Sequence, residues 1–191
     1  MFLKRLAMLT LVGVWLTSTG VAEERPWRGG EFRGSVILTV TGNISNPTRT
    51  AIHEEIDKFF IYNNIEFDQA TQFDYAWLAT LPQVTVKADF PMGDDSHVHS
   101  FTGPELVEVI RAAGATGEMV TLTALDGYAI EVPMADLVEK GAVLALKRDG
   151  IPFGIGDFGP AQLVFPRAER LDLAHMNDDW WIWSIYHINV E

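Results

Sequence analysis

The chain has 191 residues, of which 48% are hydrophobic and 21% are charged, and its formal net charge is −12. This length is enough to bury a hydrophobic core, and the composition is that of a folded chain rather than a disordered one. The negative charge repels phosphate backbones and anionic headgroups, so we expect neither nucleic-acid binding nor binding to a membrane surface. The sequence contains no cysteine, which excludes disulfides, thiolate nucleophiles and thiolate ligands for a metal.

Residues 1–22 have the pattern of a secretory signal peptide. Lys4 and Arg5 give a positive start, a short apolar stretch follows, and a small-x-small cleavage site ends at Ala22. No later stretch reaches the roughly 18 apolar residues of a membrane span. We therefore predict an exported protein, periplasmic or secreted, with no membrane span after cleavage. The polar, glycine-containing residues 23–34 are predicted to form a flexible N-terminal arm.

Residues 35–191 are predicted to form one domain of short strands and short helices. The predicted strands are, in chain order, 35–41, 59–62, 65–67, 84–88, 119–124, 128–132, 142–147, 162–165 and 181–190. The predicted helices are 50–58, 72–81, 104–113 and 133–139. Asparagine and glycine turns join 59–62 to 65–67 and 119–124 to 128–132 as hairpins. This mixture, which lacks regular strand–helix alternation, indicates an α+β fold.

Three tryptophans gather at the start of the last predicted strand. Alternation along a strand would place Trp181 and Trp183 on one face and Trp180 on the other. Burial in the core and a surface for stacking a partner or a sugar both remain open for this aromatic strand.

Five short motifs follow one another along the chain. They are Phe73-Asp74 with Leu81-Pro82, Phe101-x-Gly103 with Gly114, Ala124 to Tyr128 with Val132-Pro133, Leu144 to Leu146 with Asp149 to Pro152, and Gly159 to Pro166. Their order and spacing resemble the oxidoreductase molybdopterin-binding domain of the sulfite oxidase fold, especially its small exported members. The resemblance implies mixed twisted sheets with short helices, and a cleft for a molybdenum ion held on a pterin dithiolene.

Two departures from the family concern this cofactor. The resemblance implies a cysteine ligand to molybdenum within residues 89–100 and an arginine beside the cofactor's phosphate in the last motif. Residues 89–100 hold no cysteine, and Gln162 stands in the place of the arginine. Since a thiolate stabilises and tunes the metal, its loss argues against molybdenum redox chemistry.

The predicted function is accordingly an exported domain of this family that keeps a cleft for a pterin-like or other small organic ligand. Molybdopterin is the cofactor that the resemblance implies. Two alternatives stay open: an oxidoreductase that holds molybdenum without cysteine, and a non-catalytic domain that senses or binds an envelope protein.

Four residues are candidates for contacting the cofactor or another ligand. In the resembled fold the hairpin that carries Tyr128 lies near the cleft, and the guanidinium of Arg148 is a candidate to face an anion in the same cleft. Both residues also fit a purely structural role in their turns, and this interpretation stays open. Gln162 is a candidate by its place in the last motif. Ser96 is one because other molybdenum enzymes use serine or aspartate as the protein ligand.

A second set of candidates, Asp94, Asp95, His97 and His99, clusters in one polar loop. Histidines two residues apart project from one side of an extended chain, and with a carboxylate they form a zinc or copper site. Either aspartate is also a substitute for the molybdenum cysteine. A solvated loop without any ligand has the same composition, so both interpretations stand at this stage.

Overall fold

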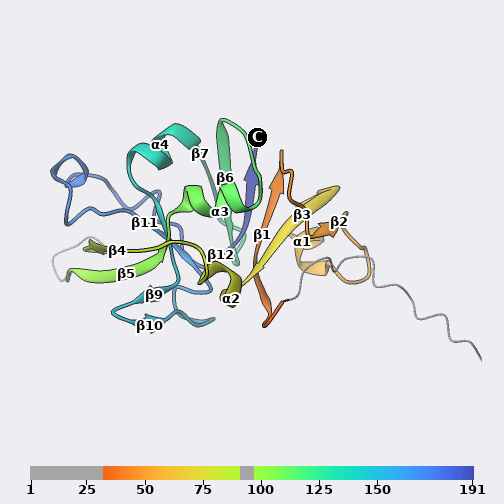
Figure 1. Cartoon of the computed structure of the whole chain (residues 1–191), viewed down its shortest axis with the longest axis horizontal. Helices are drawn as coiled ribbons and strands as arrows, with labels where there is room; N and C mark the ends of the chain where they lie inside the picture. Colours follow the sequence, from red (N-terminus) through yellow and green to blue (C-terminus); the bar gives the residue numbers. More distant parts are fainter. Residues whose placement is uncertain (1–31, 91–96) are drawn as a thin grey trace, which may run out of the picture.

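The computed structural model describes residues 32–90 and 97–191, and in this part it shows twisted sheets with short helices (Figure 1). The α+β prediction is confirmed. No helix in the described ranges is long and apolar enough to cross a bilayer. The predicted signal peptide, residues 23–31 of the predicted arm, and the candidates Asp94, Asp95 and Ser96 lie outside the described residues.

A six-stranded sheet forms the centre of the domain. Its strands, in spatial order, are β2 (Arg49–Thr50), β3 (Gln69–Asp74), β1 (Val36–Gly42), β12 (Ile185–Val190), β6 (Met119–Ala124) and β7 (Ala129–Pro133). The neighbours β1 and β12 run parallel, and the other pairs are antiparallel. The first and last strands of the described chain therefore lie side by side in the middle of the sheet (Figure 1).

Two smaller sheets pack beside the central one. The first has the order β10 (Ile151–Pro152), β9 (Lys147–Arg148), β5 (His99–Pro104), β4 (Gln83–Ala88), and the second pairs β11 (Gln162–Val164) with β8 (Val143–Ala145). Gly103 lets β5 cross β8 closely, because a Cβ there would lie 2.0 Å from the carbonyl oxygen of Leu144. The glycine of the Phe-x-Gly motif is thus required by packing.

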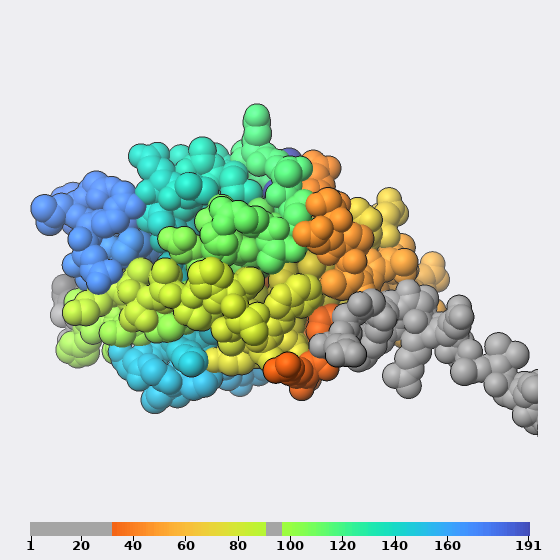
Figure 2. Space-filling view, in the orientation of Figure 1, coloured from red at the N-terminus to blue at the C-terminus, as the bar shows by residue number. Residues whose placement is uncertain are grey.

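Short helices flank these sheets. They are α1 (Lys58–Tyr62), α2 (Tyr75–Leu78), α3 (Leu106–Ala112), α4 (Met134–Glu139) and the 3₁₀ turn η1 (Leu171–Leu173). The predicted helix 104–113 is present as α3, and it buries Leu106, Val109 and Ile110 against the core as its spacing indicates. The segment with η1 forms a lobe at one end of the molecule, and α1 lies towards the other end (Figures 1 and 2).

Two predicted elements in residues 50–67 are wrong. Residues 59–67 do not form a hairpin, because helix α1 takes up their first half. Asn64 has the positive φ of 55° expected for this dipeptide, but it follows the end of a helix instead of joining two strands. The predicted helix 50–58 is replaced by extended chain and a turn at 54–56.

The predicted helix 72–81 is wrong in its first part. Strand β3 continues to Asp74, because the ladder with β1 extends that far. Only Tyr75–Leu78 forms helix α2, and Asp74 caps it by accepting the N–H of Trp77 at 2.7 Å.

The carboxylate of Asp74 also holds the beginning of the domain. Its other oxygen accepts the N–H groups of Arg33 at 2.6 Å and Gly34 at 2.9 Å. Burial raises the pKa of this carboxyl, but the N–H groups of Trp77, Arg33 and Gly34 outweigh burial, so the pKa lies below its ordinary value. The described end of the N-terminal arm is therefore bonded to the sheet.

Candidate ligand-binding cavity

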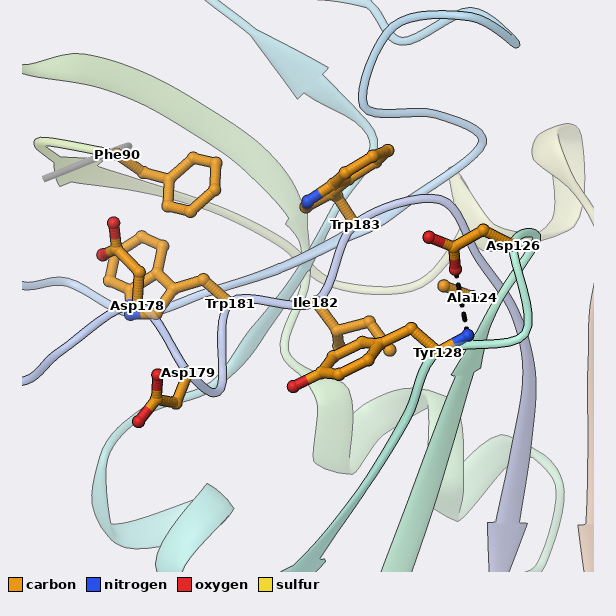
Figure 3. A pocket seen from close by; sticks show the side chains of 9 residues that line it. All are labelled: Phe90, Ala124, Asp126, Tyr128, Asp178, Asp179, Trp181, Ile182 and Trp183. Carbon is orange, nitrogen blue, oxygen red and sulfur yellow. Dashed lines mark hydrogen bonds between the residues drawn. The ribbon is translucent and has the colours of Figure 1, made fainter.

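A cavity of about 420 Å³ lies where three parts of the chain meet: the end of β4, the β6–β7 turn, and the segment before β12. Such a volume suits a small organic molecule. The lining residues, drawn in Figure 3, are Phe90, Ala124, Asp126, Tyr128, Asp178, Asp179, Trp181, Ile182 and Trp183. Aromatic rings and carboxylates make up most of this surface.

The β6–β7 turn positions the first wall of the cavity. Gly127 has φ 86°, the left-handed conformation that closes the three-residue loop between Ala124 and Tyr128, and the side chain of Asp126 accepts the N–H of Tyr128 at 3.0 Å. The hairpin predicted from Asp126-Gly127 is confirmed. Tyr128 lines the cavity and is 53% exposed, although a hydrogen bond of the turn holds its backbone in place.

The segment before β12 supplies the opposite wall. Trp181 is fully buried, and its indole stacks on Phe90 with ring centroids 5.4 Å apart. Trp183 is 45% exposed and touches Phe158 edge to face. The prediction that Trp181 and Trp183 share one face of a strand is wrong, because β12 begins only at Ile185, after Ser184 with a positive φ of 56°.

Arg167 contacts two of the lining residues, Asp178 and Trp181, and is 3% exposed. Its guanidinium donates to the carboxylates of Asp89 at 2.6 Å and Asp178 at 2.7 Å, and to the carbonyl oxygens of Met176 and Asp89. Its central carbon lies 4.4 Å from the ring centroid of Trp181. This cation, which the sequence analysis did not single out, is fully engaged by protein groups.

The four ligand candidates are not brought together by the described structure. Tyr128 lines the cavity. Arg148 lies over the ring of Phe158 at 5.0 Å, and that ring contacts Trp183 of the lining, so Arg148 is one aromatic ring away from the cavity. Gln162 is fully buried in β11, outside the lining, and Ser96 lies in the part that is not described.

The proposed metal ligands are only partly described. His99 bonds through Nδ1 to Asp149 at 2.6 Å, and His97 is exposed. The N–H of Ser100 and the side chain of His99 hold the pKa of Asp149 below its ordinary value. Within residues 32–90 and 97–191, no three histidine or acidic side chains are arranged to bind a metal ion. A zinc or copper site that includes Asp94 or Asp95 stays a prediction.

The described lining does not fit a phosphate-bearing pterin. A phosphate needs cationic or N–H donors, yet the lining residues supply the carboxylates of Asp126, Asp178 and Asp179 and no lysine or arginine. The guanidinium of Arg167 below them is already bonded to two carboxylates. The sequence also lacks the cysteine that a molybdenum ion would require in the resembled family. The described residues of this cavity therefore do not fit that cofactor.

Comparison with known proteins supports the fold. No family model matches the sequence, and no curated protein is similar to it. Among solved structures, the sulfane dehydrogenase SoxCD from Paracoccus pantotrophus matches with a TM-score of 0.55 and 14% sequence identity. The match covers 80% of this chain and 37% of the SoxCD chain. This chain thus shares the fold of a part of a dehydrogenase, at an identity that carries nothing beyond the fold.

The buried amide of Gln162 leads to a stability prediction. Neither its nitrogen nor its oxygen has a hydrogen-bond partner among the described residues. An unpaired buried amide destabilises a fold, so we expect Gln162→Met to raise the free energy of unfolding by about 1 kcal/mol. Urea unfolding followed by circular dichroism measures this change. Gln162→Glu has the same size but places a charge at this buried position, so we expect it to lower the free energy of unfolding. If Gln162→Met were less stable than the parent protein, the amide would have hydrogen-bond partners in solution.

Proposed function

We propose that this protein is an exported, non-redox domain with the molybdopterin-oxidoreductase fold, and that it binds a small organic ligand in the cavity beside Tyr128. The observation that carries the proposal is the cavity itself, about 420 Å³ in volume and walled by aromatic side chains. The order of the sequence motifs and the dehydrogenase-like fold support the family. The lack of cysteine and the acidic lining favour binding over molybdenum chemistry.

The exposure of two large rings favours a ligand. Trp183 and Tyr128 are 45% and 53% exposed, although each is held in place, Trp183 by its contact with Phe158 and Tyr128 by its turn. Rings of this size at a concave surface lose little conformational entropy when they cover a ligand. Exposed apolar surface that is gathered in one cavity is typical of a binding site.

The first experiment is to export the full chain in a bacterial host and analyse the purified protein. We expect a mass that begins at residue 23, no fluorescent pterin after denaturation, and molybdenum far below one atom per chain. Native mass spectrometry or a ligand-observed NMR screen is expected to detect a bound organic molecule whose occupancy Trp183→Leu lowers. Near-stoichiometric molybdenum together with pterin would refute the proposal and restore an oxidoreductase.

A second candidate function, binding to an envelope protein, is favoured by helix α1. None of its residues is buried, and Phe59, Ile61 and Tyr62 are 44%, 41% and 82% exposed. A second hollow, larger than the first at about 760 Å³, is lined by Lys58 and Ile61 of this helix. A photo-crosslinking residue in place of Tyr62 is expected to capture one partner protein in cells. The same residue in place of Glu131, on β7, is the control and is expected not to capture this protein. Equal capture at both positions would remove this candidate.

A further inference from the structure

The charged side chains of the described cavity lining are all carboxylates. Asp126 and Asp179 accept only from the N–H of Tyr128 and the side-chain amide of Asn177, and in the described residues neither carboxylate has a basic group within ion-pair distance. Asp178 shares the guanidinium of Arg167 with Asp89. The described lining itself holds three aspartates and no lysine or arginine, so its net charge is negative, within a chain whose net charge is −12.

Aromatic rings face the same space. Figure 3 shows Trp183 on one side of the cavity and Tyr128 on the other, with Phe90 and Trp181 at its far end. The indole of Trp181 already contacts Phe90 and Arg167, whereas Trp183 and Tyr128 keep much of their ring surface exposed. The face of an aromatic ring carries negative potential and attracts a cation, most strongly when that cation leaves water.

The protein contains its own example of this chemistry next to the cavity. The guanidinium of Arg167 lies 4.4 Å from the ring centroid of Trp181 and forms ion pairs with two carboxylates. Trp183, Asp126 and Asp179 line the cavity itself, and the described lining includes no lysine or arginine beside them. An anionic ligand would meet like charge at every charged side chain of this lining.

From these observations we infer that the ligand is a small organic cation, namely an alkylamine or a quaternary ammonium compound. The inference rests on the proposed function, since it assigns a ligand class to the same cavity. The cationic head is placed between Trp183 and Tyr128, with Asp126 and Asp179 supplying charge, and the remaining apolar part lies against Ile182. Tight aromatic and carboxylate contacts to a desolvated cation are the basis of quaternary ammonium recognition in general.

The test compares small molecules that differ in charge, and two of them, choline and its carbon analogue, have the same shape. Binding of choline, of benzyltrimethylammonium and of 3,3-dimethylbutan-1-ol, the uncharged carbon analogue of choline, is measured by titration calorimetry and ligand-observed NMR, with benzoate as the anionic probe. We expect choline to bind at least about tenfold more tightly than its analogue. Higher salt is expected to weaken the binding of the two cations and to leave the binding of the uncharged analogue unchanged.

Matched variants locate the site. Trp183→Leu keeps an apolar side chain without an aromatic face, and Asp126→Asn keeps the acceptor of the turn without its charge. Each is expected to weaken cation binding about five- to tenfold. Tyr62→Ala and Glu131→Gln remove an exposed ring and an exposed charge elsewhere, and both are expected to leave binding unchanged.

The outcomes separate the inference from the proposed function. If choline and its analogue bind equally, or benzoate binds more tightly, and Trp183→Leu abolishes this binding, the ligand is not a cation. That result would overturn the inference but keep the proposed small-molecule site. A folded protein that binds none of the four probes and carries no organic ligand would overturn both. A cation preference that depends on Trp183 and Asp126 supports both.

Discussion

Replacement of Arg167 by methionine is expected to lower the free energy of unfolding by about 3–5 kcal/mol, because a buried guanidinium loses its hydrogen bonds to two carboxylates and two carbonyl oxygens. The side chain is 3% exposed, and its removal leaves Asp89 and Asp178 close together without the cation that both contact. For a domain of this size the melting temperature is expected to fall by roughly 10 °C. Methionine retains a contact with Trp181, so the loss measures mainly the charge and its hydrogen bonds.

Two further variants make this prediction specific. In the triple variant Arg167→Met, Asp89→Asn, Asp178→Asn no carboxylate is left unpaired, and we expect it to recover more than half of the lost stability. Arg111→Ala breaks the exposed pair with Glu108 on α3 and is expected to cost less than about 1 kcal/mol. Thermal and urea unfolding give all three values. A loss below about 1 kcal/mol for Arg167→Met would mean that the buried guanidinium contributes little to the fold.

The second large effect is a loss of stability in mild acid, which we assign to His187. Burial lowers the pKa of this imidazole from 6.5 to about 4. Thr41 donates its hydroxyl to Asn189 and accepts from Nε2 of His187, which leaves Nδ1 unprotonated and without a partner among the described residues. The ring is therefore buried in its neutral form at neutral pH.

The direction of the pH dependence follows from this lowered pKa. Above about pH 6.5 both the folded and the unfolded chain hold a neutral imidazole, and the full stability is present. As the pH falls from about 6.5 to about 4 only the unfolded chain takes up the proton, so the free energy of unfolding falls by about 3 kcal/mol. The lowered pKa values of Asp57 and Asp74 add a further loss, but only below their ordinary value of 3.8.

Urea unfolding at pH 7, 5.5 and 4.5 measures this effect. His187→Gln offers Thr41 a similar N–H and carries no titrating group, so its stability is expected to stay nearly flat across this range. His175→Gln removes an exposed histidine and is expected to keep the pH dependence of the parent protein. An unchanged slope in His187→Gln would show that the acid sensitivity arises elsewhere.

The elements that sequence analysis predicted correctly are those whose local signals agree. The hairpin of β6 and β7 has alternating apolar residues around Asp126-Gly127, and helix α3 ends before Gly114, which has φ 63°. Helix α1 was mistaken for a strand because a short aromatic run has no decisive period. Its conformation depends on contacts with Phe67 and with Tyr186, far along the chain.

The cavity was predictable only in part, for a similar reason. Tyr128 was found because a turn motif marks it. Arg167 was not, since its partner Asp89 is 78 residues away and no local pattern joins them. The charge of the lining was likewise hidden, because Asp126 and Asp179 approach one cavity from two distant segments.

The pairing of β1 with β12 has a consequence for how the chain is made. Thr41 and Asn189 are joined across a separation of 148 residues, and β12 stands between β1 and β6 in the sheet. Until β12 has been synthesised, the two halves of the central sheet have no strand to connect them. Completion of this sheet therefore depends on a contact between segments far apart in the chain, which is the kind of contact that makes folding slow.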